Sequence, residues 1–287
     1  MNNAGETIRR LEALIGREGV AEDYARLRIA LLRVQAEVLA ELLAAGAADM
    51  QVRGGVKAAE APAVIDPETL PVDLPLARRL LDATIQIVAE HGSAGDRLRR
   101  LQAMMAEEPG LLEELIRRAA LAGDGGRAVS PEIPAELLLF VARIVAAPFV
   151  TAAAVRIEQS ETQPPGSDGY CPLCGSPPGL AELRAGDGGR VLLCSLCGHR
   201  FEFGRLVCPF CGVDDQSALG TLTVDAEQAR WIETCDRCRH YLKTIDGRRL
   251  PEGRQPVPLV EEVARMYLDL LAEREGFHRG APLAALR

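Results

Sequence analysis

The chain has 287 residues, enough for one large domain or two ordinary domains with a substantial core. Its formal net charge is −8, and the segment that holds the cysteines is acidic as well, so the basic stripe of a nucleic-acid-binding module is missing. The segment from Met1 to Gly5 lacks the basic and apolar regions of a secretory leader, so we expect a cytoplasmic protein with reduced thiols.

Residues 1–160 are predicted to form an all-α helical domain. A short amphipathic pattern over 6–18 precedes a stronger one over 21–45, where Tyr24, Leu27 and Leu31 begin a stripe at three- and four-residue steps. Glycines and prolines between 54 and 75 then predict a long irregular crossover. Helical patterns resume over 75–91, over 96–105 and over 109–123.

The most apolar run, 133–155, has the composition of a membrane span. Glu136, Arg143 and Pro148 interrupt it, and the charge-free remainder is too short to cross a bilayer. We therefore predict a buried central helix, kinked or broken at Pro148, and no membrane span.

All eight cysteines lie in one stretch, as four Cys-x-x-Cys pairs with the spacing C-x2-C-x19-C-x2-C-x10-C-x2-C-x23-C-x2-C. Two residues between two thiolates allow a single turn to present both sulfurs to one tetrahedral metal ion. Gly175, Gly198 and Gly212 follow three of the pairs, and glycine takes the positive φ of such a turn without a Cβ penalty. We predict that all eight cysteines bind metal: Cys171, Cys174, Cys194, Cys197, Cys208, Cys211, Cys235 and Cys238.

Other interpretations of the cysteines fit less well. Disulfides are disfavoured in a reducing compartment, and a redox Cys-x-x-Cys normally occurs once and opens a helix. Sequential pairing gives two closed four-thiolate sites, the first from the first two pairs and the second from the last two. A nested arrangement would make the middle pairs share a site across only ten residues, whereas a cross-brace stays open as an alternative.

Short strand-like segments alternate with turns after a polar, Pro- and Gly-rich boundary at 160–170. The strands are expected at 180–185, 190–194, 201–206, 220–224, 230–235 and 241–245. They predict two small rubredoxin-like or zinc-ribbon β modules, over 161–205 and 206–250. A C-terminal segment, 251–287, contains a helix over 259–275 that we expect to pack back on the helical domain. The predicted fold is α+β and multidomain.

A tetrahedral four-sulfur site accepts iron or zinc, so two metal ions per chain are predicted without a choice between them. His199 and His240 each follow a cysteine pair by two residues, and we expect them at the surface or beside a ligand because both sites are already complete. Phosphate-loop, nucleophile-elbow and zinc-protease signatures are missing, and a closed metal site keeps no open position for a substrate. We predict no catalytic and no cofactor-binding residues, and hence no enzyme.

Three blocks carry a resemblance to a known family: CPLCGSPP, LLCSLCGHRFEFGRLVCPFCG and ETCDRCRHYLK. They resemble the formate dehydrogenase accessory protein family, the FdhE type. The resemblance implies a helical N-terminal domain joined to two rubredoxin-like modules that bind iron, with the eight cysteines as the functional residues. This chain departs from the family pattern at Phe201, where relatives can carry Trp, and at Arg239, which replaces the usual glycine after the fourth pair.

The resemblance also implies a cytoplasmic assembly factor that binds the catalytic subunit of respiratory formate dehydrogenase during maturation, before export. Two alternatives stay open: a zinc-ribbon regulator that binds nucleic acid or transcription machinery, which the acidic charge disfavours, and rubredoxin-like electron transfer. The expected partner is the catalytic subunit, with no nucleic acid, and a homo-oligomer is allowed. We expect Arg205 and Tyr241 to be exposed between the cysteine turns.

Overall fold

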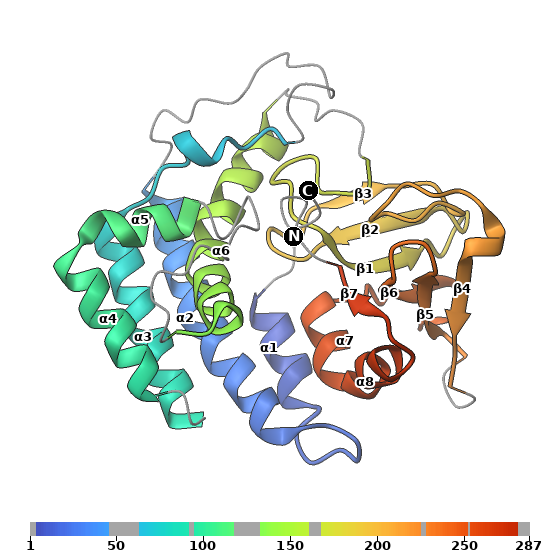
Figure 1. The fold of residues 1–287 in the computed structure, drawn as a ribbon, viewed down its shortest axis with the longest axis horizontal. Coiled ribbons are helices and arrows are strands. Elements are labelled where there is room, and N and C mark those ends of the chain that lie inside the picture. The colour runs from blue at the N-terminus through green and yellow to red at the C-terminus, as the bar shows by residue number, and fades with distance from the viewer. Residues whose placement is uncertain are drawn as a thin grey trace.

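The computed structural model describes residues 4–45, 63–91, 95–117, 133–160, 168–224, 228–251 and 253–280. A group of helices forms one side of the molecule and a sheet forms the other (Figure 1). The N-terminal helices are α1 (Ala4–Glu12), α2 (Glu22–Ala44), α3 (Leu74–His91), α4 (Gly95–Glu107), α5 (Pro109–Arg117) and α6 (Ala135–Gln159). Their order agrees with the helical patterns of the sequence, and the predicted α+β class is confirmed. The first helix, predicted over 6–18, was predicted too long and ends at Glu12, and the predicted end of the helix over 109–123 lies outside the described residues.

The central helix, α6, is buried against α2 and α3, as its apolar composition predicts. Within the described residues it is the one helix long and apolar enough to cross a membrane, and 72% of its most apolar window is buried inside the protein. The helix continues through Pro148 without a break. Proline has no N–H to give to the carbonyl of Ile144, and the side chain of Gln35 donates to that carbonyl instead, at 2.8 Å. A neighbouring helix therefore satisfies the group that Pro148 leaves free.

The strands form a single sheet, in the order β3-β2-β1-β6-β5-β4, with β7 paired to β6. Their bounds are β1 (Pro178–Leu183), β2 (Arg190–Cys194), β3 (Arg200–Glu202), β4 (Leu219–Leu222), β5 (Arg230–Cys235), β6 (His240–Asp246) and β7 (His278–Arg279). The first three come from the first cysteine module and the next three from the second. The modules are joined by parallel pairing of β1 with β6, in which Ala181 faces Thr244 and Leu183 faces Asp246.

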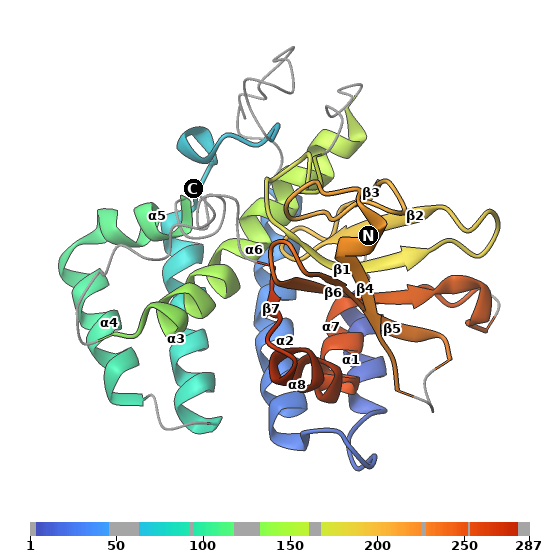
Figure 2. The ribbon, with the colours of Figure 1, turned by 45° about the vertical axis from the view of Figure 1, so that its right-hand side comes forward.

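The C-terminal helix is divided in two, at Arg265, where φ is −139° and ψ is 44°. The first piece, α7 (Pro258–Ala264), packs on the helical side, where Val260 and Val263 share a small core with Leu11 and Ile29. This agrees with the expectation that the segment packs back on the helices. The second piece, α8 (Met266–Arg274), covers the sheet, through the cluster Ile232, Tyr241, Leu268, Ala272 and Phe277 (Figure 2).

The helices and the sheet also share a continuous apolar core. The largest cluster of buried side chains runs from α2, α3 and α6 to Cys171, Leu173 and Leu192. Backbone hydrogen bonds join the chain just before α3 to the first cysteine pair, from Val64 N to the carbonyl of Pro172 at 3.0 Å and from Ile65 N to that of Leu173 at 2.8 Å. The predicted domain boundary falls largely on 161–167, which lie outside the described residues, and the domain limits stay a prediction.

Candidate metal centres

The eight cysteines gather in two groups of four. The first cluster is Cys171, Cys174, Cys194 and Cys197, and the second cluster is Cys208, Cys211, Cys235 and Cys238. Within each cluster all four sulfurs lie within 4.8 Å of one another. This is the grouping that sequential pairing of the Cys-x-x-Cys turns gives, and not that of a nested or cross-braced arrangement.

The sulfur separations fit a tetrahedral metal site and not a disulfide. Measured Sγ–Sγ distances are 3.5 Å for Cys174 and Cys194, 3.6 Å for Cys171 and Cys197, and 3.7 Å for Cys211 and Cys235. A tetrahedron with metal–sulfur bonds of about 2.3 Å has edges of about 3.8 Å, whereas a disulfide needs a separation of about 2.05 Å. Both clusters could therefore hold a four-coordinate metal ion, and the four-sulfur set accepts iron as well as zinc.

The chemistry of the thiols supports a cation between them. Burial, together with hydrogen bonds that the Cys171 thiol makes with Cys174 and Cys194, raises the pKa of Cys171 far above that of a free thiol. Hydrogen bonds with the other three thiols, together with burial, raise the pKa of Cys197 well above its ordinary value. Four thiols at these distances, three of them buried, cannot all ionise on their own, because each negative charge opposes the next. A bound metal ion would supply the positive charge that lets all four act as thiolate ligands.

Each Cys-x-x-Cys pair forms a tight turn, which we call a knuckle and number from first to fourth along the chain. In the first knuckle Gly175 N donates to the carbonyl of Cys171 at 2.8 Å, and in the third Gly212 N donates to that of Cys208 at 3.0 Å. The residue after the pair has a left-handed backbone, with φ of 72° at Gly175, 73° at Gly198 and 71° at Gly212. The turn therefore requires a residue that tolerates positive φ, as the sequence indicated.

The fourth knuckle departs from this rule. Arg239 occupies the glycine position with a φ of 59°, the one non-glycine residue with positive φ in the described part of the chain. Its guanidinium donates to the carbonyl of Glu275 at 2.8 Å and to that of Gly276 at 3.3 Å, and it pairs with Asp236 at 2.8 Å. These contacts attach the second cluster to the end of α8, where unpaired carbonyls carry partial negative charge.

The first cluster is attached to the helical side by Arg143 of α6. Its Nη2 donates to Ser195 Oγ at 2.8 Å, between the two cysteines of the second knuckle. Burial lowers the pKa of Arg143, whereas the nearby Cys194 and Cys174 raise it. The sequence marked Arg143 only as an interruption of an apolar run, because nothing local indicates that this side chain reaches a cysteine turn.

Both histidines that follow cysteine pairs lie beside a cluster without completing it. His199 Nδ1 lies 2.5 Å from Glu158 Oε1 of α6, and its ring stacks on that of Phe201. The ring of His240 lies 5.3 Å from that of Phe210 in the third knuckle. Arg205 is exposed, as expected. The expectation for Tyr241 was wrong: its side chain is buried, and its hydroxyl donates to Asp269 at 2.8 Å.

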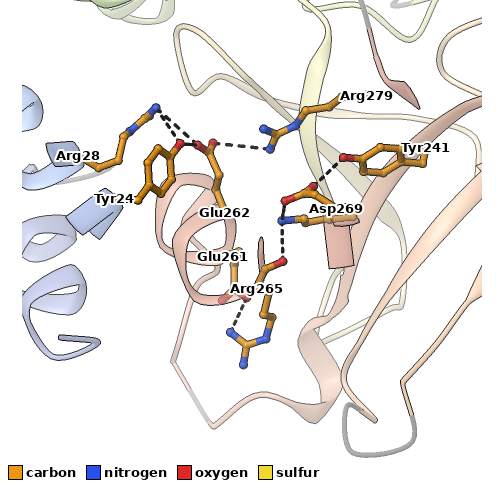
Figure 3. Close-up of polar contacts among 9 residues, drawn as sticks. Tyr24, Arg28, Tyr241, Glu261, Glu262, Arg265, Asp269 and Arg279 are labelled. Atoms are coloured by element: carbon orange, nitrogen blue, oxygen red, sulfur yellow. Dashed lines mark hydrogen bonds and ion pairs between the residues drawn. The ribbon is translucent and has the colours of Figure 1, made fainter. Parts of the chain in front are cut away.

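A buried polar network, not indicated by the sequence, joins the sheet to the helices through α7 and α8 (Figure 3). Tyr24 of α2 donates to Glu262 at 2.5 Å, and Glu262 also lies 3.5 Å from Arg28 and 3.6 Å from Arg279 of β7. Burial acts to raise the pKa of Glu262, but the two arginines and the tyrosine outweigh it and lower that pKa. The carboxylate is therefore held in its charged form by partners from both ends of the chain.

A second group of polar contacts lies on β6 and α8. Lys243 Nζ lies 2.5 Å from Asp269 Oδ2 and donates to the carbonyl of Arg265 at 3.0 Å, at the break between α7 and α8. Burial lowers the pKa of Lys243, although Asp269 opposes the shift. The sheet, the broken C-terminal helix and α2 are thus connected by paired charges (Figure 3).

No family model matches the chain. A 112-residue stretch is 36% identical to the protein FdhE homolog of Aquifex aeolicus and covers 38% of each chain. Over 163 residues the chain is 31% identical to the protein FdhE homolog of Pseudomonas putida, covering 52% of this chain and 48% of that relative. The matched stretches thus span less than half of these relatives' own lengths.

A solved structure extends the likeness over the rest of the chain. The crystal structure of the FdhE protein from Pseudomonas aeruginosa superposes with a TM-score of 0.59 at 25% identity, over 99% of this chain and 96% of that one. These matches support the FdhE family for this chain. The helical side, the sheet with its two clusters and the C-terminal helices are consistent with an FdhE-like fold. The family name indicates an accessory protein and not the catalytic enzyme.

Proposed function

We propose that this chain is a cytoplasmic accessory factor that binds the catalytic subunit of a formate dehydrogenase during its maturation, before export. In this proposal each four-cysteine cluster holds one metal ion, iron or zinc. The observation that carries the proposal is the likeness to FdhE over 99% of the chain, together with two clusters whose sulfur separations suit a closed metal site.

The role proposed for the metal ions is structural. A closed four-thiolate site leaves no coordination position for a substrate. The free energy of metal binding therefore stabilises the turns that carry the ligands. Each cluster joins two knuckles that are far apart in the sequence, and the exposed residues 185–187 and 214–217 lie between such knuckles. Loss of a metal ion would therefore disorder a binding surface and not a single contact.

The acidic charge of the chain does not favour the alternative of nucleic-acid binding. Residues 171–238 contain six arginines, no lysine and nine acidic residues. Four-thiolate clusters would make this segment more negative still, which opposes binding to phosphate groups.

The test uses the full-length protein and a purified formate dehydrogenase catalytic subunit from the same organism. Wild type should bind the subunit, and Cys208→Ser combined with Cys211→Ser should abolish binding while far-ultraviolet circular dichroism still reports folded helices. A double variant that binds as wild type does would remove the second cluster from the mechanism. Wild type that binds DNA or RNA near physiological salt, and not the subunit, would replace the proposal with the regulatory alternative.

A further inference from the structure

The edge strand β4 leaves part of its backbone unpaired. It is the last strand of the sheet. The hydrogen bond from Asp236 N to Ala218 O, at 2.8 Å, shows which residues of β4 direct their backbone N–H and C=O groups toward β5 and which direct them outward. In an antiparallel pair every second residue exchanges hydrogen bonds with its partner, and the residues between point their groups to the other side. With Gly220 opposite Thr234, the groups of Gly220 face β5, and those of its two neighbours on the strand face outward.

Those outward groups belong to Leu219 and Thr221. The N–H of Leu219 is satisfied by the carbonyl of Gln216. The carbonyl of Leu219 and both backbone groups of Thr221 have no hydrogen-bond partner in the part of the chain that the structure describes. Three backbone groups are therefore free in a row, spaced to pair with another extended strand.

The sequence does not protect this edge. The nine residues 216–224, QSALGTLTV, contain no charge and no proline, in a chain in which 26% of residues are charged. Proteins normally block an exposed strand edge with lysine, proline or an inward charge, because an open edge pairs with other chains. Acidic residues border the stretch on both sides instead: Asp214 and Asp215 before it, and Asp225 and Glu227 after it.

A cavity of about 160 Å³ lies beside the free edge. Its exposed lining residues are Arg205, Leu206 and Thr221, so its mouth opens next to the free backbone groups. Arg190 and Glu233 inside the cavity form an ion pair, with Nη2 2.5 Å from Oε2, so together they add no net charge. The apolar wall is formed by Leu206, Phe210, Leu219 and Leu242. An apolar cavity of about 150 Å³ holds a benzene-sized group, so this one has room for a single large apolar side chain.

Building on the proposed function, we infer that β4 and this cavity form the docking site for an extended segment of the catalytic subunit. The segment adds a strand to the edge of the sheet, and one of its apolar side chains enters the cavity. Its centre is uncharged, matching 216–224, and basic residues flank that centre, matching the acidic residues that border 216–224 in the sequence. Backbone hydrogen bonds provide affinity in this mode of recognition, and the side-chain pocket provides selectivity.

The charges argue against a second copy of this chain as the occupant. In the sequence, acidic residues border 216–224 on both sides, so pairing with a second copy would bring two stretches with acidic flanks together. Like charges placed opposite each other across strands are destabilising. A partner segment with basic flanks has the opposite effect.

The experiment measures the affinity of the purified catalytic subunit for full-length variants by isothermal titration calorimetry. Thr221→Pro removes the outward N–H and leaves the hydrogen bonds between β4 and β5 intact, so it should weaken binding at least about tenfold. Thr221→Val keeps the N–H and should bind within about twofold of wild type. Leu206→Asp places a charge at the cavity mouth without touching the backbone and should also weaken binding by about tenfold or more.

Leu270→Asp is the matched control for Leu206→Asp, since Leu270 is 61% exposed on α8 and Leu206 is 54% exposed. It should bind as wild type does. If wild type binds and both Thr221→Pro and Leu206→Asp bind equally well, the docking site is wrong and the proposed function stands. If wild type does not bind the subunit, both are wrong. Self-association that is lost in Thr221→Pro during sedimentation would assign the edge to a second copy and overturn the inference.

Discussion

The guanidinium of Arg239 lies over the ring of Phe277, with its Cζ 3.9 Å from the ring centroid, while its backbone holds a position that glycine fills in the other three knuckles. A non-glycine residue in this region costs about 1 kcal/mol or more, so it persists where its side chain gains more than that. The gain here is the attachment of the second cluster to the C-terminal segment. His278 N adds to it by donating to the carbonyl of Arg239 at 2.7 Å.

Replacing Arg239 should therefore loosen the second cluster. Arg239→Gly relieves the backbone strain but loses the side-chain contacts. Arg239→Ala loses the side-chain contacts and keeps the backbone strain. We expect metal release to a chelator to be slowest in wild type, faster in Arg239→Gly and fastest in Arg239→Ala. The affinity of the second cluster for its metal ion should fall about tenfold in Arg239→Ala. Arg237→Ala, at an exposed position in the same knuckle, is the control and should release metal as wild type does. Equal release from Arg239→Gly and wild type would show that the stacking and carbonyl contacts are dispensable.

The two clusters should differ in what they stabilise. Cysteines of both clusters belong to the core shared with α6, but the first cluster is the more buried: only Cys197 is partly exposed there, whereas Cys211 and Cys238 are both partly exposed in the second. Carefully reduced protein should contain two metal ions per chain by elemental analysis. Cys171→Ser with Cys174→Ser should lose one metal ion and also lower the melting temperature of the helices. Cys208→Ser with Cys211→Ser should lose one metal ion with little effect on the helices. If the second double variant lowered the melting temperature of the helices more than the first, burial against α6 would not explain the difference between the clusters.

Gln35 should stabilise α6 at its proline. Gln35→Leu leaves the carbonyl of Ile144 buried without a donor, which should lower the free energy of unfolding by about 1 to 3 kcal/mol. Gln86→Leu, which removes only an exposed hydrogen bond to Glu90, should change it by no more than about 0.5 kcal/mol. Urea unfolding monitored by circular dichroism measures both. Similar values for the two variants would mean that water satisfies the carbonyl of Ile144.

Glu262 should make the stability depend on pH. Its folded pKa is lowered, so its charge contributes stability above the unfolded value of about 4.3 and loses that contribution as the pH falls through the folded pKa. Glu262→Gln should lower the free energy of unfolding by about 2 kcal/mol at neutral pH, and the difference from wild type should shrink below about pH 4. Glu22→Gln, in an exposed pair with Arg26, should cost no more than about 0.5 kcal/mol. If the free energy of unfolding of Glu262→Gln differed from that of wild type by the same amount at every pH, the charge of Glu262 would not be the cause of the difference.

The helical part should fold without the cysteines. A chain ending at residue 160 should show a helical spectrum and melt cooperatively, because α2, α3 and α6 bury one another's apolar faces. Its melting temperature should lie below that of the whole protein, since it lacks α7 and the hydrogen bonds from 64–65 to the first knuckle. A random-coil spectrum would show that the helices depend on the sheet.

The local features could be predicted from the amino-acid sequence alone. The spacing of the cysteine pairs indicated two groups of four, because a Cys-x-x-Cys turn needs only neighbouring residues and a positive φ at the next position. Helix positions followed from apolar periodicity, and strands β2 and β5 were predicted with their observed limits, 190–194 and 230–235. In each case the interactions that decide the outcome lie within a few residues along the chain.

Tertiary structure decided how these pieces are joined. The pairing of β1 with β6 merges two predicted modules into one sheet, and it joins residues about sixty positions apart that no local pattern relates. Gln35 carries α6 through Pro148, Arg239 takes a glycine position because α8 ends beside it, and Tyr241 is buried because α8 covers that face of the sheet. Each depends on a partner from a distant segment, which a sequence pattern cannot show because distance in space is set only when the chain folds.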